Sequence, residues 1–348
     1  MEQKQQGQLE GMSKFTPENI LANFEKSRIV ADNRFADLYS DFENDMQRAK
    51  DLRDVYNNEL NPDKVGSIGE ALIFTCLSEG ALGKSITARG TNDYDDLFHG
   101  ADILIESKAK QQRDPIVSTI DVTLSQPDIN RQRNTLIENE STFEAGFKKK
   151  LERVKRHVLM LSKLSDNESV ELSAWMQRGG LREKRGPHNE AKFKDAEKFM
   201  LLKYYKNPAT SDNPDEPHFI VSGPQIIVSV DNSFVNKILS QEGEVQHKAI
   251  DELNNLLQLE VPISVLALNK YVEKVALQAQ KEGKGTNIFF ASYRAACKAW
   301  VGTFFENEEY AFRIQKAIEV SKSNPATRSQ MSYVNKTLEE TFGIKIFE

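Results

Sequence analysis

The stretch "LFHGADILIESKAKQQRDPIVSTIDVTLS", residues Leu97 to Ser125, decides the fold. Its two apolar parts, "GADILIES" and "PIVSTIDVTLS", are rich in isoleucine and valine, a composition that predicts β-strands. The polar segment "KAKQQRDP" between them predicts the turn of a hairpin. Each strand nevertheless contains an aspartate, Asp102 in the first and Asp121 in the second. Aspartate is disfavoured in strands and costly to bury alone, so both side chains must have partners.

The hairpin geometry predicts that the two aspartates meet. If Asp102 lies opposite Asp121, the midpoint of the hairpin falls between residues 111 and 112, inside the polar segment. The two carboxylates then face each other at one end of a sheet and repel, unless a proton or a cation lies between them. Carboxylate oxygens are the hard ligands that Mg²⁺ prefers, so this end of the sheet is a candidate metal site.

A third carboxylate precedes the hairpin in the segment "GSIGEAL", which we expect to be helical and which carries Glu70. Gly66 and Gly69 would let this helix come close to the sheet. A helical glutamate followed by two strand aspartates resembles the PD-(D/E)XK nuclease superfamily, over residues 65–231 of this chain.

The resemblance implies an α/β (α+β) fold of the restriction-endonuclease-like type. This fold has a mixed central sheet flanked by helices, and here it would carry helical N- and C-terminal extensions. The resemblance also implies a catalytic and metal-binding set of Glu70, Asp102 and Asp121, which would hold Mg²⁺ or Mn²⁺. The activity that it implies is that of a magnesium-dependent deoxyribonuclease.

The sequence departs from the family pattern at one position. The superfamily has a lysine two residues after the second strand acid, and this chain has Thr123 there. The family tolerates relocation of this lysine, and we assign its catalytic role to Lys108, with Arg131 and Arg133 as other substitutes.

A second alignment takes Asp96 as the first strand acid and Glu106 with Lys108 as the acid and the lysine. Its midpoint is residue 101, where a strand is expected and not a turn. We therefore prefer Asp102 and Asp121.

The charge distribution indicates a nucleic-acid partner in spite of a net charge of −6. Residues 131–206 hold 18 lysines and arginines against 11 acids, a local excess of +7. The densest part is the predicted helix "FKKKLERVKRH". Its candidate phosphate-binding residues are Lys148, Lys149, Lys150, Arg153 and Arg156. The partner implied by the resemblance is DNA, and an ordinary solvated helix face stays open as the alternative.

The remaining sequence organises into a polar tail (1–14), a helical extension (15–60), the core (61–268, with the basic insertion at 131–206) and a helical C-terminal region (269–348). The C-terminal helices could support a homo-oligomer. The segment "EVPISVLALN" at residues 260–269 suggests a further strand. His99 lies three residues before Asp102 and could contact the scissile phosphate.

Several classes of protein are excluded by composition. No apolar run approaches the roughly 20 residues of a membrane span, and the polar N-terminus lacks the core of an export signal, so we expect a cytoplasmic protein with no membrane partner. Cys76 and Cys297 cannot form a disulfide framework or a cysteine-rich zinc site. Two alternatives to a nuclease stay open: a catalytically silent nuclease-fold protein that binds nucleic acid or a protein partner, and a helical assembly protein of viral or mobile-element origin.

Overall fold

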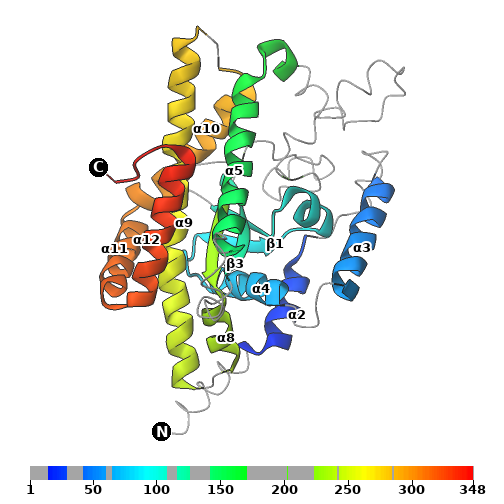
Figure 1. Cartoon of the computed structure of the whole chain (residues 1–348), viewed down its shortest axis with the longest axis vertical. Helices are drawn as coiled ribbons and strands as arrows, with labels where there is room; N and C mark the ends of the chain where they lie inside the picture. Colours follow the sequence, from blue (N-terminus) through cyan, green and yellow to red (C-terminus); the bar gives the residue numbers. More distant parts are fainter. Residues whose placement is uncertain are drawn as a thin grey trace, which may run out of the picture.

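The computed structural model describes residues 15–29, 42–59, 65–107, 116–125, 142–170, 202, 223–240, 243–283 and 286–347. Its elements in chain order are α2 (Pro17–Ser27), α3 (Phe42–Glu59), α4 (Val65–Ser78), β1 (Ile86–Gly90), the π-helix η3 (Asp95–His99), β2 (Ile103–Ser107), β3 (Ile116–Ser125), α5 (Thr142–Lys163), β4 (Gln225–Asp231), α8 (Asn232–Ser240), α9 (Glu244–Lys281), α10 (Ile288–Val301), the π-helix η6 (Gly302–Glu306), α11 (Glu308–Ser323) and α12 (Pro325–Phe342). A central sheet lies among these helices (Figure 1). The mixed α and β class expected from the sequence is confirmed.

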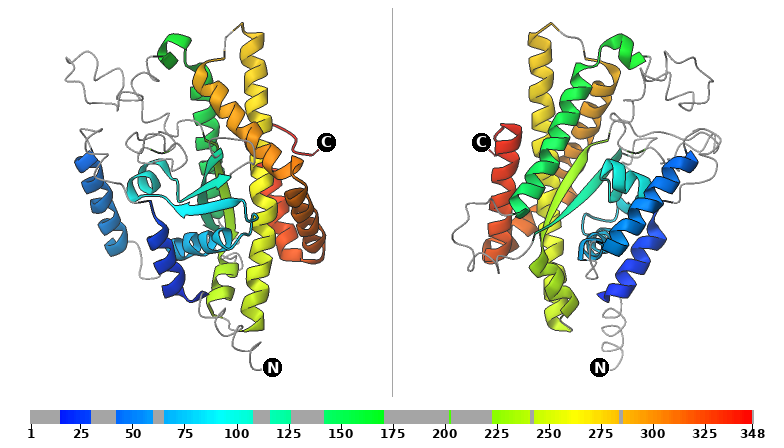
Figure 2. Two further views of the ribbon diagram at one scale, coloured as in Figure 1. Left: turned by 180° about the vertical axis from the view of Figure 1, so that it is seen from behind. Right: turned by 45° about the vertical axis from the view of Figure 1, so that its right-hand side comes forward.

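The sheet has four strands in the order β1-β2-β3-β4. The pairs β1–β2 and β2–β3 are antiparallel, and β3–β4 is parallel. Parallel neighbours need a crossover connection, and the helix α5 belongs to the connection between β3 and β4. The further views place the sheet between the α2, α3 and α4 side of the molecule and the long C-terminal helices (Figure 2).

Two helices pack on opposite faces of β3, and one of them, α4, comes especially close at a glycine. A Cβ on Gly69 of α4 would lie 2.6 Å from both Cδ atoms of Leu124, so α4 packs closely on the face that carries Leu124. A Cβ on Gly146 of α5 would lie 3.6 Å from Cγ2 of Thr123. Successive strand residues point to opposite faces, so α4 and α5 cover different sides of the sheet. The close approach expected at Gly69 is confirmed.

The helix α9 runs along the molecule beside the sheet and contains 38 residues, a length of about 57 Å (Figure 1). The strand expected at residues 260–269 is wrong, because these residues lie inside α9. All residues from Glu260 to Val265 are buried, so the helix is apolar on several sides and its sequence shows a continuous apolar run. Such a run does not distinguish a buried strand from a buried helix.

Side chains from the C-terminal helices cover the free edge of β4. Glu260 Oε1 in α9 accepts the backbone N–H of Ser229 at 2.6 Å, and Gln330 Nε2 in α12 donates to the Ser229 carbonyl oxygen. These two side chains satisfy backbone groups that a further strand would otherwise pair. The helices α10, α11 and α12 pack along α9. Within the described residues, no helix combines the length and the apolar character needed to cross a membrane.

Candidate active site

Asp102 and Asp121 lie next to each other at one end of the β2–β3 hairpin. The register pairs Ile103 with Ile120, and one further step in this register brings Asp102 opposite Asp121. Both side chains are buried, with 6% and 2% of their residue surfaces exposed. The hairpin pairing predicted from the two aspartates is therefore the pairing that the structure has.

At the start of β2, the Asp102 side chain takes part in the hydrogen bonding between β2 and β3. The Asp102 N–H donates to the Ile120 carbonyl at 3.1 Å, and the Asp102 side-chain Oδ2 accepts the N–H of Val122 at 2.6 Å. The carboxylate thus bonds a backbone group of β3 just beyond the last β2–β3 pair, which gives this strand aspartate a structural partner. Its position at the sheet end still leaves it next to the other acids of the site.

Asp121 is held by two cations from α5. Lys150 Nζ donates to Oδ1 of Asp121 and to the Val122 carbonyl oxygen at 2.7 Å. Arg153 Nη2 donates to the other oxygen, Oδ2. Burial raises the pKa of Asp121, while Lys150 and Arg153 oppose this rise. Each oxygen of this carboxylate therefore has a side-chain cation beside it.

Glu70 is the third acid of the cluster. Burial and the charge of Asp96 raise the pKa of Glu70 to about 7. Burial also raises the pKa of Asp102 well above its usual range, and the charges of Glu70, Asp121 and Asp96 raise it further. Asp102 is therefore coupled electrostatically to both other acids predicted from the sequence, Glu70 and Asp121, and Asp96 is a fourth member of the cluster. The alternative partner Glu106 lies four residues beyond Asp102 in β2, where its Oε2 is 3.8 Å from Arg89 Nη2.

Two arginines from the N-terminal helices complete the cluster, and the sequence did not predict them. Arg53 of α3 contacts Asp96 Oδ2 at 2.8 Å, and Arg28, which follows α2, contacts the same oxygen at 3.2 Å. Both arginines also contact Asp93. Because the partners are at least 40 positions apart in the sequence, no local spacing could indicate these ion pairs.

His99 is tied to its own turn of the chain. Its Nδ1 lies 2.9 Å from Asp95 Oδ1, and Asn92 Nδ2 donates to Asp95 Oδ2 at 2.5 Å. Asn92 also accepts the Asp95 N–H, as a helix N-cap does. These bonds account for the position of His99, whose contact with a phosphate stays a prediction.

The basic side chains of α5 fall into two sets by their contacts and exposure. Lys148, Lys149 and Arg156 are exposed and stay candidates for phosphate contact. Lys150 and Arg153 point instead at Asp121. One sequence signal could have separated them: Gly146, Lys150, Arg153 and His157 recur at helical spacing beside the buried stripe of α5. The assigned lysine, Lys108, and its substitutes Arg131 and Arg133 lie outside the described residues.

The carboxylates suit Mg²⁺ or Mn²⁺ in chemistry, but their arrangement does not fit an ion. In the part of the chain that the structure describes, no three His, Cys, Asp or Glu side chains are arranged to hold a metal. The oxygens of Asp121 are bonded to Lys150 and Arg153, and Oδ2 of Asp102 is bonded to Val122. A metal at Asp121 would have to displace one of these partners.

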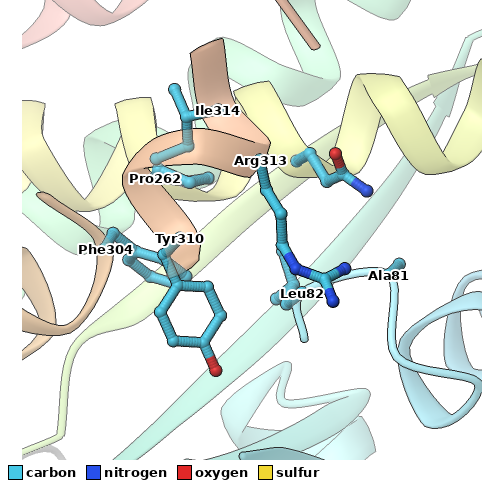
Figure 3. A pocket seen from close by; sticks show the side chains of 8 residues that line it. Ala81, Leu82, Pro262, Phe304, Tyr310, Arg313 and Ile314 are labelled. Atoms are coloured by element: carbon cyan, nitrogen blue, oxygen red, sulfur yellow. The ribbon is translucent and has the colours of Figure 1, made fainter. Parts of the chain in front are cut away.

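A small hollow lies away from these acids, between α9, α11 and the turn after α4 (Figure 3). Its volume of about 10 Å³ has room for one water molecule. The lining side chains include Leu82, Pro262, Tyr310 and Arg313. This volume is far below that of a substrate site.

Comparison of the chain with protein-family models, with curated proteins and with solved structures finds no significant match.

Proposed function

We propose that the chain is a metal-dependent nuclease of restriction-endonuclease-like fold that hydrolyses phosphodiester bonds of DNA. The observation that carries the proposal is the contact between Lys150 and Asp121. The family pattern needs a lysine beside the second strand acid, and this sequence has Thr123 where that lysine would be. Lys150 of α5 brings an ammonium group to the same carboxylate from another element.

The charged groups around Asp121 suit this reaction. The Lys150 side chain is 31% exposed and that of Asp121 is 3% exposed, so Lys150 lies between the buried carboxylate and solvent. A cation beside an attacking water and a phosphodiester stabilises the negative charge that develops as the bond breaks. The exposed residues Lys148, Lys149 and Arg156 would position the nucleic acid through its phosphates.

Metal dependence is part of the proposal, with Glu70, Asp102 and Asp121 as the ligands. When bound, Mg²⁺ or Mn²⁺ would supply the Lewis acid for hydrolysis. The ion pairs of Asp121 mean that the carboxylate set must rearrange before it holds an ion.

The same ion pairs favour a second candidate, a catalytically silent protein of this fold that binds nucleic acid. In such a protein the two cations would replace the metal permanently, as stable partners of Asp121. Both candidates predict binding of nucleic acid, and only the first predicts cleavage.

A cleavage assay separates the two candidates. Supercoiled plasmid is incubated with the full chain over a titration of Mg²⁺ and, separately, of Mn²⁺. The nuclease should nick the plasmid only with metal, and Asp121→Asn should lose the activity. Glu273→Gln is a matched control, because Glu273 forms a surface ion pair with Arg294 in the C-terminal helices. Binding without cleavage at any metal concentration would support the silent protein.

A further inference from the structure

The guanidinium group of Arg153 occupies a space that the backbone at Gly100 leaves open. Gly100 has φ +62°, and a Cβ there would lie 2.6 Å from Nη1 and 2.8 Å from Cζ of Arg153. Gln225 Nε2 of β4 donates to the Gly100 carbonyl at 2.7 Å and so fixes this part of the backbone. Any other residue at position 100 would place a side chain where the guanidinium lies.

This guanidinium is only partly satisfied by the protein. Nη2 bonds Asp121, while Nε is buried and has no hydrogen-bond partner among the described residues. The Arg153 side chain is 42% exposed, whereas the Asp121 side chain is 3% exposed. Arg153 can therefore reach an anion in solvent, but Asp121 can be reached only after its partners move.

The surroundings of Asp121 contain further unused polar atoms. Thr119 and Thr123 flank Asp121 on the same face of β3, because side chains two residues apart share a face. Both residues are buried, and neither hydroxyl has a partner within the described part of the chain. Buried polar groups are normally bonded, so unpartnered hydroxyls beside a carboxylate indicate that a ligand or water belongs there.

We propose that Arg153 exchanges between two anions: it holds Asp121 in the free protein and moves to a phosphate group of nucleic acid when that is bound. A guanidinium binds carboxylate and phosphate with the same fork of N–H donors, so the exchange keeps its hydrogen bonding intact. The move frees one oxygen of Asp121 next to the bound phosphate. Binding of nucleic acid and opening of the carboxylate are thereby coupled. The inference rests on the proposed function only in taking a nucleic-acid phosphate as the anion.

The test is a double-mutant cycle on binding, measured without metal. Affinity of the full chain for a fluorescent 20-base-pair DNA duplex is followed by anisotropy in EDTA at low salt. Asp121→Asn removes the carboxylate that competes for Arg153, so we expect it to bind the duplex threefold to tenfold more tightly than the wild type. Arg153→Gln should bind about tenfold more weakly. The double variant should match Arg153→Gln, because the gain from Asp121→Asn needs the arginine.

Arg156→Gln is the matched control. It removes the same kind of charge from the same helix, but the Nε of Arg156 bonds the Glu152 carbonyl oxygen and not Asp121. Asp121→Asn should therefore still give its full gain in the Arg156→Gln background. If Asp121→Asn increased the affinity equally in both arginine backgrounds, the increase would come from the change in net charge alone, and the exchange would be overturned. The exchange would also be overturned if Asp121→Asn did not increase the affinity, or if the chain did not bind the duplex.

Two precautions keep the result clear. Arg153→Met, which keeps the aliphatic stem of the side chain, serves as a second neutral variant, and thermal melts followed by circular dichroism check that each variant is folded. The readout does not depend on cleavage: a chain that never nicks plasmid but shows the coupling refutes the nuclease and retains the exchange. A chain that nicks plasmid but shows no coupling supports the nuclease and refutes the exchange.

Discussion

Asp102 Oδ2 accepts the backbone N–H of Val122 at 2.6 Å, across the end of the β2–β3 hairpin. This bond explains how an aspartate is tolerated in a strand: its side chain pairs a backbone group that lies beyond the last residue pair of the two strands. It also means that Asp102 supports the fold as well as the proposed site. The two roles can be separated, because an amide oxygen can accept the same hydrogen bond but is a poor metal ligand.

The first prediction concerns this separation. Asp102→Asn should abolish metal-dependent cleavage and change the free energy of unfolding little, since the asparagine oxygen still accepts the Val122 N–H. Asp102→Ala should lose cleavage too, and it should cost about 1–3 kcal/mol of stability because a buried N–H is left unpaired. Urea unfolding at pH 7 measures the stability of both variants, and the plasmid assay measures their cleavage. Equal stability of the two variants would show that the bond to Val122 contributes nothing.

The second prediction is that Lys150 of α5, which contacts Asp121, acts in cleavage, whereas the exposed Lys148 and Lys149 act in binding. Lys150→Gln should lower the cleavage rate at saturating duplex by about 100-fold or more, because the ammonium beside Asp121 is absent. Lys148→Gln with Lys149→Gln should mainly weaken binding. Each lysine of that pair that binds a phosphate should, once replaced, reduce the slope of log affinity against log salt by roughly 0.9. Lys150→Arg, which keeps a charge, should recover part of the rate; a Lys150→Gln enzyme with the wild-type rate would remove this residue from the site.

The residues of the hairpin show which parts of the site can be predicted from the sequence. The pairing of Asp102 with Asp121 could be predicted because strand registers follow from the sum of two residue numbers and the position of the turn. The position of Lys150 beside Asp121 could not be predicted, because Lys150 belongs to a helix 29 positions away and no hairpin register relates that helix to β3. The arginines Arg28 and Arg53 were missed for the same reason.

The mistaken strand at residues 260–269 has a different cause. Periodicity identifies a helix by the contrast between its buried and exposed faces. The middle of α9 is buried on several sides, between β4 and the C-terminal helices, and so this contrast disappears. Pro262 in the same run also argues against a long helix, because a proline inside a helix removes one backbone N–H donor and its ring clashes with the carbonyl of the preceding turn.

The third prediction tests the approach of α4 to the sheet. Gly69→Ala gains helix propensity of about 1 kcal/mol, but its Cβ would lie 2.6 Å from the Leu124 methyl carbons, and overpacking costs typically 1–3 kcal/mol. We expect a small net loss of stability for alanine and a larger one for Gly69→Val. Combining Gly69→Val with Leu124→Ala should recover part of the loss, so the two changes should be non-additive in urea unfolding. Additive losses would show that Gly69 and Leu124 do not constrain each other.

The last prediction concerns the buried carboxyl of Glu260, remote from the proposed site. Burial raises the pKa of Glu260 well above 4.5, and the bond from the Ser229 N–H only partly offsets this. Its Oε2 has no hydrogen-bond partner among the described residues. A carboxyl whose pKa is raised in the folded state binds its proton more tightly there than in the unfolded chain. Its contribution to stability is therefore complete below pH 4.5 and is lost as the pH rises through the folded-state pKa.

Glu260→Gln keeps the shape and the acceptor for Ser229 but cannot ionise. The free energy of unfolding of the wild type should fall relative to that of this variant as the pH rises from 4.5 through the folded-state pKa, and above that pKa the variant should be the more stable protein. Glu260→Ala should be less stable than either, because it leaves a cavity and an unpaired Ser229 N–H at the edge of β4. Glu273→Gln, which changes a partly exposed glutamate on the same helix, should shift stability by less than about 1 kcal/mol at any pH. Urea unfolding of all four proteins at several pH values gives the comparison. A wild type and a Glu260→Gln variant with parallel pH profiles would show that Glu260 is ionised in the fold and has a counter-charge.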